Sequence, residues 1–131
     1  MEGPKNGPNQ MGQSSVEDRP PVLTEDQFYR ALASKYRRRV LYCLFDMKST
    51  TVEELATILC GWEATTTGTM QLPADRNKIH IALMHSHLAQ LANAGLIEYD
   101  FQSDSVRLKP LHPKVKDVIR QSVKTGQQDE S

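Results

Sequence analysis

The sequence lacks the features that mark membrane, secreted and disulfide-bonded proteins. It has no apolar run near the roughly 18 residues that a membrane-spanning helix needs, and the first residues, MEGPKNGPNQMGQSS, contain no apolar stretch typical of a signal peptide. Its two cysteines, Cys43 and Cys60, lie far apart and form no CxxC pair. We therefore expect a cytoplasmic protein whose thiols are small buried side chains in a reducing compartment.

The chain also lacks an excess of charge. Its 16 basic residues balance 16 acidic residues over 131 positions, so nothing draws the whole molecule to nucleic acid or to a membrane surface. Electrostatic contact with a partner must therefore come from a local cluster. The length suits one domain with one modest core.

Both ends of the chain are polar. Residues 1–22 are rich in Gly, Pro, Asn, Gln and Ser, and such a segment buries too little apolar surface to offset its ordering entropy. We predict a disordered leader there and a flexible tail over 123–131, which ends in TGQQDES. The folded domain is then expected over 23–122.

Apolar periodicity predicts two helical regions in the first half of the domain. Apolar residues recur at every fourth position from 28 to 44, which predicts helix over 25–46, either unbroken or as two helices with Ser34 capping the second. Residues 47–51 leave room for a turn or one stub of strand. Thr51 and Glu54 form a capping box for the next helix, which Gly61 is expected to end. Residues 63–73, EATTTGTMQLP, then read as a loop.

The second half predicts a long helix, a hairpin and a last helix. The long helix should start behind Pro73, span about 74–94 and end at Gly95. The runs 96–100 and 105–109 alternate apolar and polar residues around a turn, which indicates a β-hairpin. Beyond Pro113, four apolar residues at helical spacing predict an amphipathic helix: Val115, Val118, Ile119 and Val123.

The predicted order is helix, helix, long helix, hairpin, helix. A helix pair whose second member leads directly into a two-stranded hairpin is the layout of a winged helix-turn-helix. The fold class expected from the sequence is therefore mainly α with a small β-hairpin.

Three stretches resemble a known family. ALASKYRRRVLYCL (31–44), TTVEELA (50–56) and HSHLAQLANAGLIEYD (85–100) are similar to the corresponding helices and wing of ArsR-type regulators. The chain is closer still to an uncharacterised winged-helix family common in halophilic archaea, in which Arg-Arg-Arg-Val-Leu and His-x-His-Leu-x-x-Leu-x-x-Ala-Gly occur with Glu-Tyr-Asp. The resemblance covers about residues 25–109.

The resemblance implies a DNA-binding transcriptional regulator. This sequence departs from the pattern at three points. It lacks the acidic excess of proteins adapted to molar salt, its 63–73 loop is longer than a plain helix-turn-helix turn, and it lacks the two cysteines, one residue apart on the second helix, of metal-sensing ArsR members. Cys60 stands alone there.

The segment IHIALMHSHLAQL (79–91) contains His80, His85 and His87. A helix advances about 100° per residue, so Met84 becomes the centre of a core face that also holds Ile81, Leu88 and Leu91. His80 and His87 then border the core, and no two of the three histidines have the spacing of three or four that a helical metal chelate needs. No catalytic motif accompanies them. We expect no enzyme, no metal, no cofactor and no small-molecule ligand.

The outward face of the long helix is the expected DNA contact. His85, Lys78 and Ser86 lie there and can contact bases or phosphates. Lys35 and the run Arg37–Arg39 form the only dense basic cluster. They are either a solvated face paired with Glu53, Glu54 or Asp46, or phosphate anchors beside the helix start. The predicted DNA-binding residues are Arg37, Arg38, Arg39, Arg76, Asn77, Lys78, His85 and Ser86.

The predicted partner is double-stranded DNA, bound by a homodimer because one module buries too little surface for strong specificity. The helix before Ser34 and the C-terminal helix are the expected dimer elements, unless they pack on their own domain. The tip of the predicted wing, FQSDS, has no basic residue, whereas wings that enter a minor groove usually supply Arg or Lys. An alternative is therefore a winged helix without DNA binding that acts as a protein-interaction module.

Overall fold

Helices dominate the part of the chain that the computed structural model describes, which is residues 25–130, with side chains from 26 to 125. The helices are α2 (Glu25–Ala31), α3 (Lys35–Met47), α4 (Val52–Thr67), α5 (Pro73–Ala82), α6 (Leu88–Asn93) and α7 (Pro113–Glu130), and a π turn, η2 (Leu83–His87), joins α5 to α6. The strands are β1 (Ser49–Thr51), β2 (Ile97–Asp100) and β3 (Ser105–Leu108). The predicted leader, 1–22, lies outside the described residues.

The region 25–46 forms two helices, α2 and α3, which was one of the two alternatives predicted from the sequence. Ser34 takes an extended conformation, and its hydroxyl accepts a hydrogen bond from the Tyr36 backbone N–H at 3.1 Å. This cap satisfies one of the donors that the first turn of α3 leaves without a helical partner. The chain therefore bends between α2 and α3.

The predicted hairpin is present and gains a third strand. β2 and β3 pair antiparallel, with Tyr99 opposite Val106, and β1 pairs with the other edge of β3, with Thr50 opposite Val106. Val106 is fully buried, and it anchors the central strand. The short strand β1, between α3 and α4, thus pairs with the wing, and the predicted fold class, a mainly helical winged helix-turn-helix, is confirmed.

α4 is longer than the sequence predicted. The expected end at Gly61 and the loop from residue 63 are wrong, because the helix continues to Thr67 and ends at Gly68, whose φ is +72°. A glycine inside a helix costs only about 1 kcal/mol relative to alanine. The contacts that Trp62 and Glu63 make with α3 offset this cost.

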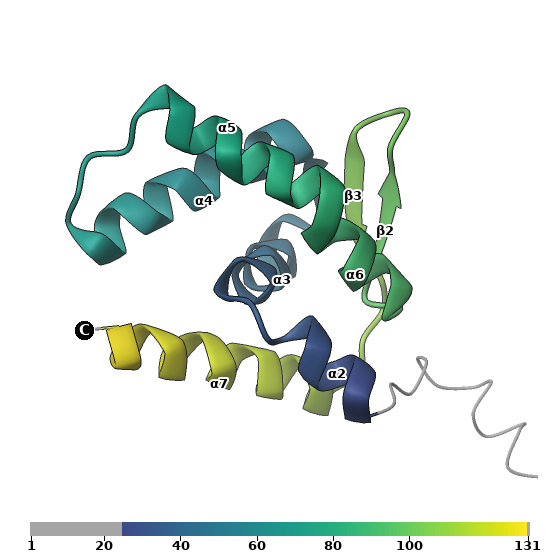
Figure 1. The fold of residues 1–131 in the computed structure, drawn as a ribbon. Coiled ribbons are helices and arrows are strands. Elements are labelled where there is room, and N and C mark those ends of the chain that lie inside the picture. The colour runs from purple at the N-terminus through teal and green to yellow at the C-terminus, as the bar shows by residue number, and fades with distance from the viewer. Residues whose placement is uncertain (1–24, 131) are drawn as a thin grey trace, which may run out of the picture.

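α3 lies at the centre of the molecule (Figure 1). The α4–α5 pair covers one side of it and α7 packs along the other, while the β2–β3 hairpin projects beside α6. The core is built mainly from fully buried leucines: Leu41, Leu44, Leu55, Leu59, Leu83, Leu88, Leu91 and Leu96.

α7 extends past the predicted end of the domain at residue 122. The helix runs from Pro113 to Glu130, and the flexibility of 123–131 stays a prediction. Ile119 is fully buried and Val123, one turn later, is 5% exposed, so the apolar face continues past residue 122. Among the described residues, no helix is long and apolar enough to cross a membrane.

Candidate nucleic-acid interface

The helix formed by α5, η2 and α6 carries one exposed stripe. Its buried side consists of Ile79, Leu83, Leu88 and Leu91. Exposed residues follow one another along its other side: Asn77, Lys78, Ile81, His85 and Ala89. The helix lies beside the wing, with α6 packed on β2, which is the arrangement that places a winged-helix recognition helix in the major groove.

The π turn sets the phase of this stripe. Leu83 and Leu88 are five residues apart, and a regular α-helix would rotate them about 140° from each other. The Leu88 N–H instead bonds to the Leu83 carbonyl, and this wider turn keeps both side chains in the core. The expected place of Ile81 on the core face is therefore wrong, since Ile81 is 56% exposed. The five-residue spacing of the two leucines was the signal in the sequence.

Arg76 holds the two helices of the helix-turn-helix together. Its guanidinium donates to the Thr57 hydroxyl at 2.9 Å, to the Glu53 backbone carbonyl at 3.1 Å and to the Glu53 carboxylate at 2.6 Å. These bonds lower the pKa of Glu53 below its usual value. Arg76 thus fixes α5 on α4, and its charge is already balanced by an acid within the protein.

Asp75 and Pro73 both favour the start of α5. The Asp75 carboxylate accepts the Leu72 backbone N–H at 2.8 Å, and Pro73 occupies the first turn, where its missing N–H costs nothing. Asn77 and Lys78 follow immediately and are exposed. These two predicted DNA contacts lie at the exposed start of the helix.

Arg37 does not fit its predicted role as a phosphate anchor. It is 7% exposed, and its guanidinium donates to the Ala31 carbonyl at 3.1 Å and to the Arg30 carbonyl at 2.8 Å. Its third contact is 3.1 Å, from Nη1 to Nδ1 of His87. Arg37 therefore ties the end of α2 to the π turn and lies inside the protein.

Arg39 is likewise too buried to serve as the predicted DNA contact. It is 3% exposed, pairs with Glu63 at 2.8 Å and stacks its guanidinium over the Trp62 ring at 5.0 Å. Lys35 pairs with the other oxygen of Glu63 at 2.8 Å. Burial alone would raise the pKa of Glu63, but the hydrogen bonds from Lys35 and Arg39 outweigh burial and lower it.

The sequence missed this acid because Glu63 was assigned to a loop. The expected ion-pair partners of the basic run were Glu53, Glu54 and Asp46, whereas Glu63 extends from the longer α4 to reach it. Of the three arginines, only Arg38 is partly exposed, and its Nη1 donates to the Leu32 carbonyl at 2.9 Å. Arg38 alone remains at the surface as a candidate phosphate contact from this run.

The histidines separate as expected. His85 is exposed, whereas His80 and His87 are partly buried. Burial, and then the neighbouring Arg37, lower the pKa of His87. Ser86 is partly buried and accepts a hydrogen bond from Gln90 at 3.3 Å, so it lies at the edge of the stripe. Within residues 25–130, no group of three or more His, Cys, Asp or Glu side chains could hold a metal ion.

Both cysteines are free and partly buried. Burial, and then the charge of Asp46, raise the pKa of Cys43 to about 11, so this thiol is protonated at neutral pH and a weak nucleophile. This agrees with the packing role expected from the sequence.

The surface of the wing carries acidic side chains and an exposed aromatic ring. Arg107 pairs with Glu98 across the two strands, and Asp104 takes a left-handed conformation with φ +61° at the turn. Phe101 is 68% exposed and packs edge-on against Tyr99. The absence of a basic residue at the tip, read from the sequence, leaves the recognition helix as the principal candidate contact.

The fold and this exposed helix define a winged helix-turn-helix protein. Residues 29–107 match the family described as a domain of unknown function (DUF7344), and the chain belongs to this family. The match includes the helix-turn-helix and nearly all of the sheet. No curated protein and no solved structure matches the chain with significant similarity.

Proposed function

We propose that the chain is a sequence-specific, DNA-binding transcriptional regulator that works in the cytoplasm and resembles ArsR-type regulators in plan. The observation that carries the proposal is an exposed stripe on a helix whose opposite side is buried in the core: Asn77, Lys78, Ile81, His85 and Ala89. Small and polar residues on such a stripe allow the helix to approach base edges closely.

The electrostatic contribution to DNA binding in this proposal is small. Lys78 and Arg38 are the cations of the predicted set that reach the surface without an acidic partner among the described residues, because Arg37 is buried and Arg39 and Arg76 pair with Glu63 and Glu53. Few phosphates are then neutralised by each chain, so few counterions are released on binding. A homodimer that presents two recognition helices would double both the ionic and the base contacts.

Mobility shift on genomic DNA fragments in a salt series tests the proposal. Affinity should fall as salt rises, and Lys78→Ala should lower the slope of log affinity against log salt by about 1. Lys124→Ala, an exposed lysine on α7, is the matched control and should leave the slope unchanged. Absence of binding to any fragment at low salt would refute the regulator.

A second candidate is a protein-interaction module that does not bind DNA. It is favoured by large apolar side chains that remain exposed before α5, on α5 and at the tip of the wing: Met70, Leu72, Ile81 and Phe101. Exposed apolar groups of this size often mark contacts with another protein. Under this alternative the salt series gives no shift, while changing Met70 and Leu72 together to serine leaves the free chain folded and weakens its complex with a protein partner.

A further inference from the structure

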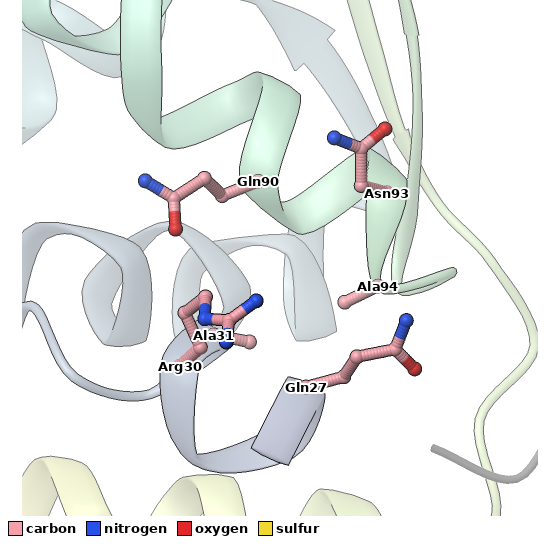
Figure 2. A pocket seen from close by; sticks show the side chains of 6 residues that line it. All are labelled: Gln27, Arg30, Ala31, Gln90, Asn93 and Ala94. Carbon is pink, nitrogen blue, oxygen red and sulfur yellow. The ribbon is translucent and has the colours of Figure 1, made fainter. Parts of the chain in front are cut away.

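A pocket of about 380 Å³ lies between α2 and the end of the recognition helix. Six residues line it: Gln27, Arg30, Ala31, Gln90, Asn93 and Ala94. Gln27, Arg30 and Ala31 belong to α2, whereas Gln90 and Asn93 belong to α6 and Ala94 follows it directly, as can be seen in Figure 2. The volume is at the lower end of the range for small-molecule sites.

The lining indicates the chemistry of a ligand. Arg30 is the one ionisable residue of the lining, so the pocket has one positive charge and no acid to cancel it. Among the described residues, no ion pair engages the exposed Arg30 side chain. A guanidinium presents a fork of N–H donors that matches a carboxylate.

The remaining polar groups are carboxamides, on Gln27, Gln90 and Asn93. Each supplies both donors and an acceptor, which suits hydroxyl or amide groups on a ligand. Ala31 and Ala94 are small and buried, and no aromatic side chain lines the pocket. A second negative charge or a flat aromatic ring would therefore have no partner here.

The pocket is also connected to the recognition helix by hydrogen bonds. Arg37 donates to the backbone carbonyls of two lining residues, Arg30 and Ala31, and its third contact is His87 in the π turn. Gln90 donates to Ser86 at 3.3 Å, so the opposite wall also contacts that turn. A ligand that joined Arg30 to Gln90 would bridge α2 and α6, next to the link that Arg37 makes between α2 and the π turn.

We propose that this pocket binds a small polar monocarboxylate, such as a sugar acid, through Arg30 and the three carboxamides, and that the bound ligand adjusts the recognition helix. The second part rests on the proposed DNA-binding function, whereas ligand binding does not. The sequence predicted no ligand because Gln27 and Arg30 are far from Gln90 and Asn93 in the chain, and only the fold brings them to one pocket.

Titration of the full chain with sodium gluconate, followed by ¹H–¹⁵N NMR, tests the binding. At constant ionic strength, the side-chain amide signals of Gln27, Gln90 and Asn93 should shift and saturate. Sorbitol, which has the same carbon count and no charge, should produce no saturating shift. Arg30→Met should lower the affinity for gluconate about tenfold or more, the factor expected for loss of a charge-assisted hydrogen bond.

Two further variants separate binding from a general charge effect. Arg30→Lys keeps the charge but loses the fork, and it should bind with intermediate affinity. Arg107→Met removes an exposed arginine on the wing and should leave the titration unchanged. Shifts that do not saturate, equal shifts with sorbitol, or full affinity in Arg30→Met would overturn the site.

The coupling is measured separately, as DNA affinity with and without saturating gluconate. A change of several-fold that disappears in Arg30→Met supports it, and an unchanged affinity with ligand bound overturns it. If the chain binds gluconate but no DNA, the regulator proposal fails while the ligand site stands.

Discussion

His87 is a single residue whose ionisation affects the stability of the fold. Because a guanidinium only donates hydrogen bonds, Nδ1 of His87 accepts from Arg37, and the neutral ring carries its proton on Nε2. The Tyr36 ring packs beside the imidazole at 5.9 Å. Protonation would place a second positive charge against Arg37 in a partly buried position.

The folded pKa of His87 lies below its ordinary value, so the unfolded chain takes up this proton first as pH falls. Its stabilising contribution is therefore complete above the unfolded pKa of about 6.5 and is lost as pH falls from there through the folded pKa. In His87→Gln, whose amide oxygen can still accept from Arg37, stability should depend less on pH in this window. Urea unfolding at several pH values measures the difference, and parallel profiles for the two proteins would contradict it.

Ile81 is the large apolar residue of the exposed stripe, so it can report on base contact. If the recognition helix lies in the major groove, its side chain can pack on a thymine methyl group. Replacing thymine by uracil at the contacted position should weaken binding about fourfold, the value of one buried methyl group. Ile81→Ala should bind both DNAs equally. Equal binding of thymine and uracil DNA by the natural chain at every position would exclude this contact and leave DNA binding itself in place.

Among the elements, helix ends followed local sequence rules at some positions and tertiary contacts at others. Ser34, Thr51 and Gly95 act as the caps and stop that the sequence predicted, because each acts on backbone groups only a few residues away. The end of α4 was not predictable in this way. Its last two turns are held by Trp62 and Glu63 against α3, and such long-range contacts override one unfavourable glycine.

Two of the predicted DNA contacts, Arg37 and Arg39, are buried for a similar reason. Helical spacing identified Lys78, within the regular α5, as outward-facing, and it did the same for His85, which lies in the π turn. It could not show that Arg37 and Arg39 point inward, because three consecutive arginines cover much of the circumference and their partners are distant in sequence. Burial of a charge depends on a partner that only the fold supplies.

Two glycines in helical contexts should respond oppositely to alanine. Gly61 lies inside α4 with open space around its missing Cβ, so Gly61→Ala should stabilise the chain by about 0.5–1 kcal/mol. Gly95 has φ +80°, and Gly95→Ala should destabilise it by about 1 kcal/mol. Thermal or urea unfolding compares the two variants directly. A stabilised Gly95→Ala would show that the turn after α6 does not require a left-handed residue.

For the whole molecule, the fold limits how a dimer could form. Ile119 and Val123 of α7 are buried against α3 in their own chain, so this face of α7 is already occupied. On the two expected dimer elements, the large apolar residues that remain exposed are Tyr29 on α2 and Val118 on α7.

The proposed homodimer should therefore depend on these two positions. In sedimentation equilibrium, Val118→Asp should shift the chain from dimer toward monomer, because it places a charge in an apolar contact. Gln121→Asp, on an exposed position of the same helix, should not. A natural chain that sediments as a monomer both alone and with DNA would rule out the dimer.

The π turn has a consequence for changes in chain length. Removal of one residue from the middle of a helix usually rotates everything beyond it out of register, but here the segment from Leu83 to Leu88 already contains one residue more than a regular turn needs. Deleting Ser86 should let an ordinary α-helix carry both leucines on the core side, so the shortened chain should still fold cooperatively. Inserting an alanine at the same point should unfold it. This helix is therefore expected to tolerate a shorter sequence better than a longer one.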